Sequence, residues 1–235
     1  MKSTSPAHTQ GYLLVNKPKG KTAFTLVAAL RKRLGVKTIG HAGTLDPLAT
    51  GVMVMLIGRE YTKLSDKFLG QDKEYVDTIH LGIETDSYDS EGQELSRSEL
   101  VPTQEAVEAA LQAFQGEISQ IPPMFSAKKI NGQKLYHLAR QGKTVERAPV
   151  TLTVKTELIA YNYPYVEIRV NCSKGTYIRS IAQDLGKMLG CGGHLCVLSR
   201  TRSGNFHLSE CIDGELVYTP DADVWPHIRQ QISWD

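Results

Sequence analysis

The chain has 235 residues, of which 41% are hydrophobic, so it is long enough to bury a full core in one large domain or two small ones. Its 27 Lys and Arg residues nearly balance its 25 Asp and Glu residues, and the net charge of +2 therefore says little about partners. The longest apolar run, residues 52–57, is far shorter than the roughly 20 residues of a membrane helix, so no membrane segment is expected.

The apolar periodicity of the sequence predicts regular elements from residue 12 onward. Residues 1–10 are polar and should form a flexible N-terminal tail, and residues 12–15 should form a strand. Thr22 can cap a helix that Gly35 ends. Residues 52–57 are predicted to be a buried strand, followed by a helix that reaches Phe68.

Further along, a strand is expected at residues 74–81, followed by an acidic and exposed connection at residues 84–94. A helix is predicted at 104–115, strands at 151–159 and 165–171, a helix at 176–189 and a last strand at 194–199. This order indicates an α+β fold built on a mixed, mostly antiparallel sheet flanked by helices.

Charge is unevenly distributed along the chain. Residues 124–147 contain six basic side chains and one acid, whereas residues 209–235 contain six acids and one Arg. The basic residues of the first segment are Lys128, Lys129, Lys134, Arg140, Lys143 and Arg147. A basic arm on a basic body suits a polyanion, although charge alone is equally compatible with a solvated helix face.

The segment GHAGTLDPLATG, residues 40–51, has no helical or strand periodicity and lies between two predicted strands. Its glycines permit positive φ angles, while Pro47 fixes its own φ and favours extended geometry at Asp46. The segment should therefore present a carboxylate on a stiff turn. An ordinary Asp-Pro turn, in which the carboxylate only accepts backbone hydrogen bonds, is the alternative.

A second unusual segment, NCSKGTYIRS at residues 171–180, leads from a strand end into a helix. Tyr177 and Arg179 fall in the first helical turn, where the helix dipole favours anions rather than cations. Arg179 is therefore expected to have a carboxylate or phosphate partner.

Several other patterns argue against cofactors and metals. The spacing of Cys191, His194 and Cys196 matches no standard zinc site. The sequence shows no secretory leader, so we expect its four cysteines to be reduced thiols in a cytoplasmic protein. No phosphate-binding or dinucleotide-binding glycine motif is present. The residues themselves thus predict a nucleic-acid-oriented protein with a presented aspartate and no metal or cofactor.

Five segments resemble TruB-type pseudouridine synthases, in the order of that family, from Gly11 to about Arg200. They are GYLLVNKPKG, GHAGTLDPLATG, KEYVDTIHLG, PPMFSAKKINGQKLYHLAR and SKGTYIRS. The resemblance implies the pseudouridine synthase fold, with an inserted RNA-gripping arm at about residues 122–147. It also implies conversion of uridine to pseudouridine at position 55, in the T loop of tRNA, after the target base is flipped out.

Carried over by position, the resemblance implies a catalytic set of Asp46 as nucleophile, Tyr75 as the residue that stacks on the base, and Arg179 as the partner of Asp46. Tyr177 and Leu198 would line the uracil pocket, and His41 would support flipped-out loop nucleotides. Other implied substrate-binding residues are Lys17, Lys128, Lys129 and Arg140.

The resemblance also implies a domain plan, with a catalytic domain at residues 11–208 and a short acidic tail at 209–235 where the family usually has an RNA-binding PUA domain. Asn16 stands where the family usually has Asp, which we interpret as a tolerated structural change. The expected partner is the T-arm stem-loop of tRNA, with no obligatory protein partner, a monomeric chain and no cofactor.

Three alternatives stay open at this point. A guide-RNA-dependent synthase would share the aspartate loop, but the insertion at residues 122–147 argues against it. A non-catalytic RNA-binding or RNA-folding protein would not need Asp46, Tyr75 and Arg179 together. An aspartate-dependent hydrolase would need a second acid or a metal site at a recognisable spacing.

Overall fold

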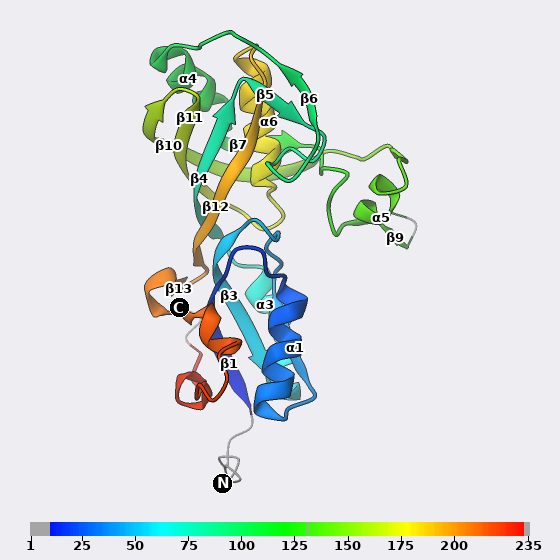
Figure 1. Ribbon diagram of the computed structural model, residues 1–235, viewed down its shortest axis with the longest axis vertical. Helices are drawn as coiled ribbons and strands as arrows, with labels where there is room; N and C mark the ends of the chain where they lie inside the picture. The colour runs from blue at the N-terminus through cyan, green and yellow to red at the C-terminus, as the bar shows by residue number, and fades with distance from the viewer. Residues whose placement is uncertain (1–9, 131, 233–235) are drawn as a thin grey trace. The chain divides into compact units, whose positions relative to one another are not determined.

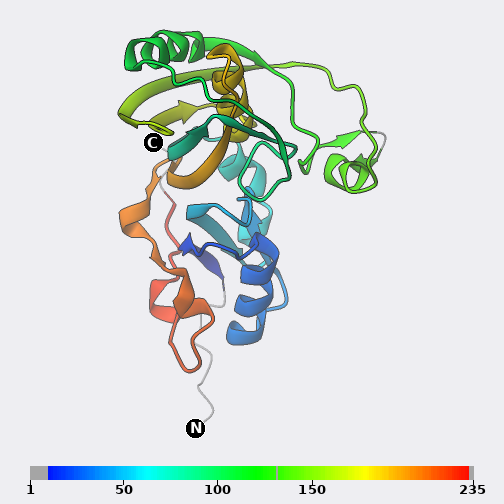
Figure 2. The same cartoon turned by 45° about the horizontal axis from the view of Figure 1, so that its top comes forward.

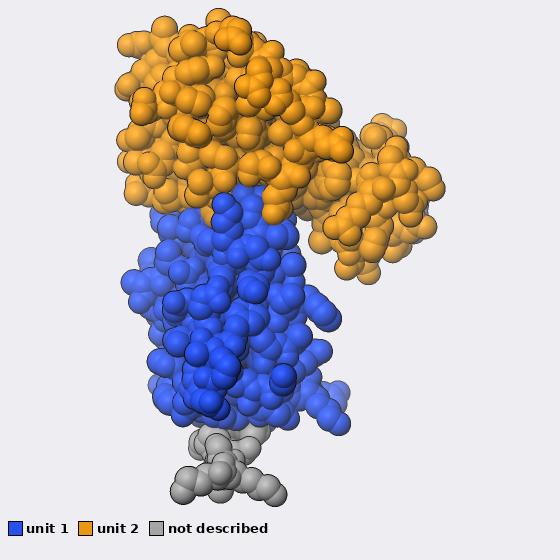
Figure 3. Space-filling view, in the orientation of Figure 1, with its two compact units in different colours: residues 1–75, 199–235 blue, residues 76–198 orange. Residues whose placement is uncertain are grey.

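The computed structural model describes residues 10–130 and 132–232, and the chain divides into two compact units (Figure 3). Unit 1 comprises residues 1–75 and 199–235, and unit 2 comprises residues 76–198. The chain passes between the units inside strand β4 (Lys73–Leu81) and returns inside strand β12 (Gly193–Ser203). Of the predicted N-terminal tail, residues 1–9 lie outside the described residues.

Strand β3 (Thr50–Ile57) is the central strand of unit 1. It pairs antiparallel with β1 (Gly11–Lys17) on one edge and with β2 (Ile39–Ala42) on the other. The end of β12 joins it in parallel through Ser199 and Arg200. All residues of β3 after Thr50 are buried, which explains why the sequence is continuously apolar there rather than alternating.

Helix α1 (Ala23–Leu34) lies beside β1 and β3 in unit 1 (Figure 1). Thr22 and Thr25 form a capping box at its start, and Gly35 ends it with φ 66° and an N–H bond to the Arg31 carbonyl. The predicted helix is therefore confirmed at both ends. The predicted helix up to Phe68 is instead two short helices, α2 (Arg59–Thr62) and α3 (Ser65–Leu69).

The acidic C-terminal segment packs onto unit 1 through backbone groups rather than through its charge. Strand β14 (Ile212–Asp213) pairs in parallel with β1, and Tyr12 and Arg229 exchange backbone hydrogen bonds at 2.8 Å. The guanidinium of Arg33 donates to the carbonyls of Val217, Thr219 and Ala222. The remaining short elements here are β13 (Phe206–His207), η2 (Leu208–Glu210), η3 (Gly214–Val217) and η4 (Trp225–His227).

Unit 2 contains a sheet in the strand order β12, β4, β11, β10, β7 (Figure 2). Its other strands are β7 (Gln115–Gln120), β10 (Val150–Asn162) and β11 (Tyr165–Cys172), and its main helices are α4 (Gln104–Leu111) and α6 (Ile178–Met188). Burial alternates strictly along β4, so one face of the sheet carries the core. The 3₁₀ turn η1 (Gln112–Phe114) ends the predicted 104–115 helix early, because Gln115 already pairs in β7.

The prediction that residues 84–94 form an exposed connection was wrong for residues 84–89, which are buried or half-buried, whereas Ser90, Glu91, Gln93 and Glu94 are exposed. The segment belongs to a hairpin of β5 (Ile83–Thr85) and β6 (Glu94–Arg97), and Thr85, Ser87 and Asp89 are only 5%, 8% and 4% exposed. Thr85 Oγ1 donates to the Asp89 carbonyl at 2.7 Å, and Ser87 Oγ donates to Asp89 Oδ1 at 2.6 Å. Hydrogen bonds within the segment thus satisfy polar side chains that its acidic composition had predicted to be exposed to solvent.

The insertion after β7 forms its own small lobe of unit 2, with β8 (Lys129–Ile130), β9 (Gln133–Lys134) and α5 (Leu135–Ala139) (Figure 1). Within residues 10–130 and 132–232, no helix combines the length and the apolar character needed to cross a bilayer. The α+β class with a mixed, mostly antiparallel sheet flanked by helices is confirmed.

Candidate active site

Asp46 opens a tight turn between β2 and β3. Its carbonyl accepts a hydrogen bond from the Ala49 N–H at 3.0 Å, with Pro47 at the second position of the turn. Leu45 and Leu48 are buried, at 4% and 3% exposure, whereas Asp46 is half-buried. The buried apolar residues on either side anchor the turn that carries Asp46.

Two glycines shape this loop as predicted. Gly43 has φ 88° and Gly51 has φ 108°, while Gly40 needs no left-handed conformation. A Cβ at Gly51 would lie 2.2 Å from the Arg200 carbonyl oxygen, so only glycine fits at this crossing of β3 and β12.

Lys17 fixes the Asp46 turn through hydrogen bonds to backbone carbonyls. Its ammonium donates to the carbonyls of Pro18 at 2.9 Å, Lys21 at 2.6 Å and Pro47 at 3.3 Å, and its side chain is fully buried. The Gly20 N–H also donates to the Pro47 carbonyl, at 2.7 Å. Burial and these contacts favour a role for Lys17 in holding the loop, rather than the expected contact with substrate.

Asn16 provides a second tie to the same loop. Its Oδ1 accepts a hydrogen bond from the Gly51 N–H at 3.0 Å. An aspartate carboxylate would offer the same acceptor oxygen, which explains why the chain tolerates Asn where the resembling family usually has Asp.

His41 lies at the end of β2, half-buried, with its Nδ1 2.8 Å from the Gly43 carbonyl. A carbonyl oxygen can only accept, so Nδ1 carries the proton and Nε2 is the acceptor of the neutral ring. The imidazole is therefore fixed in one tautomer and orientation.

Tyr75 is buried, at 8% exposure, near the start of β4. The two residues before it, Lys73 and Glu74, are held by side-chain hydrogen bonds. Glu74 Oε1 accepts from Thr201 Oγ1 at 2.8 Å, and the Lys73 ammonium donates to the Leu69 carbonyl at 2.8 Å. The chain that leads into Tyr75 is thus held on its N-terminal side.

Arg179, in the first turn of α6, has the carboxylate partner that its position predicted. Its Nη1 lies 3.4 Å from Asp89 Oδ2, and the side chains are 6% and 5% exposed. The guanidinium also donates to the carbonyls of Ser87 at 3.0 Å and Phe125 at 2.7 Å. Arg179 therefore joins helix α6, the 85–91 segment and the start of the insertion.

Two residues of this region were missed by the sequence reasoning. One is Asp89, which gave no signal beyond the expectation that Arg179 needs a partner. The other is Gln120, whose amide accepts from the Tyr177 N–H at 2.8 Å and donates to the Tyr177 carbonyl at 3.1 Å. This bidentate clamp fixes the half-buried Tyr177 just before α6. Leu198, on β12, is 6% exposed.

The insertion places cations around an aromatic ring. The guanidinium carbon of Arg140 and the ammonium of Lys134 each lie 5.5 Å from the centre of the Tyr136 ring. Arg140 and Lys129 are exposed, and Lys128 is half-buried. An aromatic surface with flanking cations is a common way to bind RNA.

The predicted site residues are shared between the two units. Lys17, His41, Asp46 and Tyr75 belong to unit 1. Tyr177, Arg179, Leu198 and the cations of the insertion belong to unit 2. A half-buried carboxylate on a rigid turn can serve as a nucleophile.

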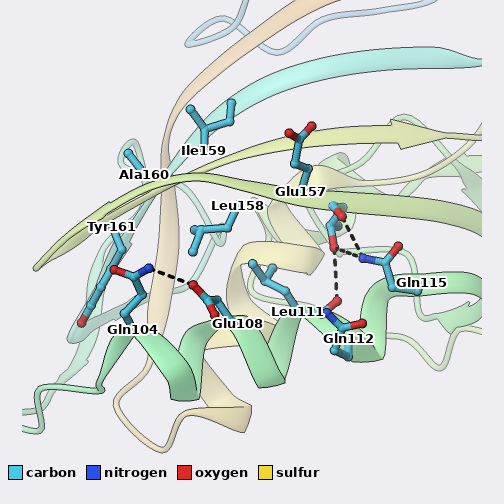
Figure 4. A pocket seen from close by; sticks show the side chains of 11 residues that line it. Gln104, Glu108, Leu111, Gln112, Gln115, Glu157, Leu158, Ile159, Ala160 and Tyr161 are labelled. Atoms are coloured by element: carbon cyan, nitrogen blue, oxygen red, sulfur yellow. Dashed lines mark hydrogen bonds between the residues drawn. The ribbon is translucent and has the colours of Figure 1, made fainter.

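Unit 2 also has a hollow of about 490 Å³ between α4 and β10 (Figure 4). Glu108 and Glu157 line it, and Gln104 donates to Glu108 at 2.8 Å. None of the predicted site residues lies there, and two carboxylates disfavour a polyanion.

Cys191, His194 and Cys196 each bond to a backbone carbonyl, of Gly192, Ile83 and Thr78 respectively. Among residues 10–130 and 132–232, no group of three or more His, Cys, Asp or Glu side chains is placed to hold a metal ion.

Two family models match consecutive parts of the chain. Residues 31–178 match the N-terminal domain of TruB family pseudouridylate synthases, and residues 179–219 match the C-terminal domain of tRNA pseudouridylate synthase B. A tRNA pseudouridine synthase B from Protochlamydia amoebophila is 64% identical over 92% of this chain and 83% of its own length. One from Francisella tularensis is 49% identical over 85% of this chain and 67% of its own length.

Solved structures agree on the fold. The Cbf5 chain of a Cbf5–Nop10–Gar1 complex superposes with a TM-score of 0.70 at 30% identity, covering 89% of this chain and 54% of that one. A chain of an H/ACA RNP bound to a substrate RNA gives 0.65 at 28% identity, covering 88% and 52%. This chain thus spans about half the length of those chains, and the predicted pseudouridine synthase fold is confirmed. With both family models and relatives of this identity, the chain belongs to the TruB family of pseudouridylate synthases.

Proposed function

We propose that the protein isomerises uridine to pseudouridine in tRNA, at position 55 of the T loop, with Asp46 as the nucleophile. Family membership supports the reaction class and the tRNA substrate. The observation that carries the assignment of the nucleophile is the Asp46 turn, which buried Leu45 and Leu48 anchor and Lys17 ties through the Pro47 carbonyl.

The proposed chemistry is redox-neutral and needs no added group. An Asp46 oxygen bonds to C1′ of the ribose as the C1′–N1 bond breaks and uracil keeps the electron pair. After the base rotates, C5 bonds to C1′ and the Asp46 oxygen leaves. The proton on C5 is lost to a base and N1 gains a proton, so the product is an isomer of the substrate.

The other residues take supporting roles in this proposal. Tyr75 stacks on the target base and is the candidate for the base that removes the C5 proton. Arg179 pairs with the Asp46 carboxylate and favours its ionised form. Tyr177 and Leu198 line the uracil pocket.

Asp89 and Gln120 act through these residues rather than on the substrate. Asp89 orients the guanidinium of Arg179 by its contact of 3.4 Å, and Gln120 fixes the backbone of Tyr177. Both side chains are buried, at 4% and 3% exposure, which suits residues that position others.

The target uridine must leave the stacked loop before Asp46 can reach C1′, at a cost of a few kcal/mol. His41 supports the flipped-out nucleotides. Lys128, Lys129 and Arg140 grip the RNA backbone of the T arm, which is a sequence-independent and salt-sensitive contribution. We further propose that the chain acts as a monomer without an obligatory protein partner.

The test uses the full chain and three RNAs: a tRNA transcript, its isolated T-arm hairpin, and the transcript with cytidine in place of the target uridine. Pseudouridine is mapped at single-nucleotide resolution. The proposal predicts product at one T-loop position in the first two RNAs and none in the third. Product elsewhere in the tRNA would contradict the proposed site, and absence of product from both uridine substrates would contradict the proposed reaction.

A further inference from the structure

The acidic C-terminal segment contacts the loop that joins β1 to α1. This loop, residues 17–22, contains Lys17 and is here called the Lys17 loop. Residues 212–218, here called the C-terminal turn, consist of β14, the 3₁₀ helix η3 and Tyr218. Helix η3 contacts both β1 and α1, which are the two elements that the Lys17 loop connects (Figure 1). The C-terminal turn therefore meets the chain on both sides of this loop.

The first contact is at Gly214, which is buried against the start of the Lys17 loop. A Cβ at this position would lie 2.3 Å from the Asn16 carbonyl oxygen and 2.5 Å from Cδ of Pro18, far inside ordinary van der Waals contact. The φ of Gly214 is outside the left-handed region, so the close approach alone requires glycine. Strand pairing fixes this approach, because Asp213 of β14 lies opposite Asn16 of β1.

The second contact is at Tyr218, four residues after Gly214. The ammonium of Lys21 lies 4.8 Å from the centre of the Tyr218 ring, which is a cation–π contact. The Tyr218 hydroxyl is 3.2 Å from Oγ1 of Thr25, and Thr25 forms the capping box with Thr22 that begins α1. Tyr218 thus restrains the end of the Lys17 loop from which α1 starts.

The C-terminal turn is itself held against α1. The guanidinium of Arg33 donates to the carbonyls of Val217 and Thr219, which flank Tyr218 in the sequence. Val217 is only 1% exposed, so its side chain anchors the turn in the core of unit 1. A contact between two anchored segments restricts the position of both.

The Lys17 loop carries this restraint to the turn of the proposed nucleophile. The Lys17 ammonium donates to the carbonyls of Pro18 and Lys21, which are contacted by the C-terminal turn, and also to the carbonyl of Pro47. The Gly20 N–H donates to the same Pro47 carbonyl at 2.7 Å. Because Pro47 directly follows Asp46, a displacement of the loop changes the position of the carboxylate.

The charge of the C-terminal segment separates positioning from RNA binding. Residues 209–235 contain six acids and one Arg, which disfavours contact with a polyanion. Two of these acids are used within the segment, since Glu210 pairs with Arg229 and the carboxylate of Asp213 caps η3. The segment should therefore affect the catalytic step rather than the affinity for RNA.

We propose that the C-terminal turn positions Asp46 for catalysis through the Lys17 loop, with Gly214 and Tyr218 as its positioning residues. The inference rests on the proposed function, because it takes Asp46 as the nucleophile. Neither positioning residue contacts the RNA in this account. Their effect reaches the reaction only through the hydrogen bonds that end at the Pro47 carbonyl.

The test measures kcat, KM and the Kd for a tRNA transcript with full-length variants, at a temperature where each variant is folded. Tyr218→Ala removes the ring from Lys21 and should lower kcat roughly ten- to hundredfold, the effect of a misplacement of up to about 1 Å, with KM and Kd unchanged. Tyr218→Phe keeps the ring and should retain most of the kcat. Gly214→Ala should lower kcat at least as much as Tyr218→Ala, and if it does not fold, Tyr218→Ala decides alone.

Amide hydrogen exchange of the free protein gives a second readout that does not depend on activity. The Gly20 N–H donates to the Pro47 carbonyl, and the Ala49 N–H donates to the Asp46 carbonyl. Both amides should exchange faster in Tyr218→Ala than in the wild type or in Tyr218→Phe, because the loop opens more often. If the wild-type protein makes no pseudouridine, the proposed function fails, while the exchange rates still show whether the C-terminal turn restrains the loop.

Arg229→Met is the matched control, because it weakens the attachment of the same segment at another place. The Arg229 guanidinium binds Glu210 at 2.8 Å, and its backbone pairs with Tyr12 at the opposite end of β1 from Lys17. This variant should keep the wild-type kcat and exchange rates. Unchanged kcat and exchange in Tyr218→Ala would overturn the inference. Equal losses of kcat in Arg229→Met, or a raised Kd with normal kcat in Tyr218→Ala, would overturn it as well.

Discussion

Nη1 of Arg179 lies 3.4 Å from Oδ2 of Asp89, and this ion pair is almost completely buried in unit 2. Removing one partner of a buried pair leaves an uncompensated charge. We expect Asp89→Ala to lower the free energy of unfolding by about 3 kcal/mol, the lower end of the range for such pairs, because Arg179 keeps the carbonyls of Ser87 and Phe125.

Urea denaturation measures this effect, and Glu94→Gln is the matched control. Glu94 forms an exposed pair with Arg97 at 2.8 Å, so its loss should lower the free energy of unfolding far less than Asp89→Ala does. Equal stability changes in the two variants would contradict a structural role for the buried pair. If Asp89 orients Arg179 for catalysis, the more conservative Asp89→Asn should lower kcat more than it raises KM.

Gly51→Ala should be among the most damaging single-methyl additions in the chain. The new Cβ would meet the Arg200 carbonyl oxygen at 2.2 Å, at a φ of 108° that other residues rarely adopt. We expect a loss of more than about 4 kcal/mol in the free energy of unfolding, or no folded protein. Gly142→Ala, with φ 69° and open space around it, should cost only about 1 kcal/mol. Thermal melts of both variants show which costs more stability, the close approach to the Arg200 carbonyl or the positive φ angle.

A comparison of Lys17 with Lys19 tests whether Lys17 holds the Asp46 loop or contacts the RNA. Lys17 is fully buried with three carbonyl partners, whereas Lys19 is exposed. Lys17→Met should lower stability by about 2 kcal/mol and reduce kcat, because the Asp46 turn loses its tie, but should leave the Kd for tRNA unchanged. Lys19→Met should leave stability and kcat unchanged. A weaker Kd with normal kcat in Lys17→Met would favour the direct substrate contact that the resemblance implied.

Charge reversal in the insertion tests the proposed grip on the RNA backbone. Lys129→Glu combined with Arg140→Glu should raise the Kd for tRNA and flatten its dependence on salt, by about 0.7–0.9 in log–log slope for each phosphate that the protein no longer neutralises. Lys187→Glu is the control, since Lys187 is an exposed cation in the last turn of α6. An unchanged salt slope in the double variant would show that these two residues of the insertion do not contact the RNA backbone.

Burial raises the pKa of the Cys211 thiol to about 12, with the charge of Glu210 adding to the effect. At pH 8 its thiolate fraction is then about a thousandfold below that of a thiol at the ordinary value of 9.0, so iodoacetamide should label it very slowly in the folded protein. Since the folded state holds this proton more tightly, the associated stability is present below about pH 9 and is lost as pH rises from there towards 12. Peptide mass spectrometry of labelled samples measures the rate, and labelling as fast as in urea would contradict the burial.

The helices and central strands could be predicted because local pattern and burial agree there. Helix α1 has a cap at each end and one apolar stripe, and β3 is buried on both faces. The strands β2, β5, β6 and β7 could not be predicted, because they have only four, three, four and six residues and lack an alternating pattern. In addition, β7 pairs with β10, which lies far along the chain.

The candidate site, too, could be predicted only in part. Pro47 and the glycines made the Asp46 turn visible from local chemistry, and the position of Arg179 in its helix predicted a carboxylate partner. The identity of that partner could not be derived, since Asp89 is 90 residues earlier in a segment whose composition indicates solvent exposure. The buried ammonium of Lys17 was equally hidden, because a lysine is almost never fully buried unless its donors are satisfied.

The central claim is that Asp46 is the nucleophile, and replacing its carboxylate with an amide tests it most directly. Asp46→Asn keeps the size of the side chain and the backbone turn but removes the nucleophilic oxygen charge. Binding of a T-arm hairpin and formation of pseudouridine are measured separately for the variant and the wild type. We predict an unchanged Kd and no detectable product from the variant. Product formation at a rate close to that of the wild type would contradict the assignment of Asp46.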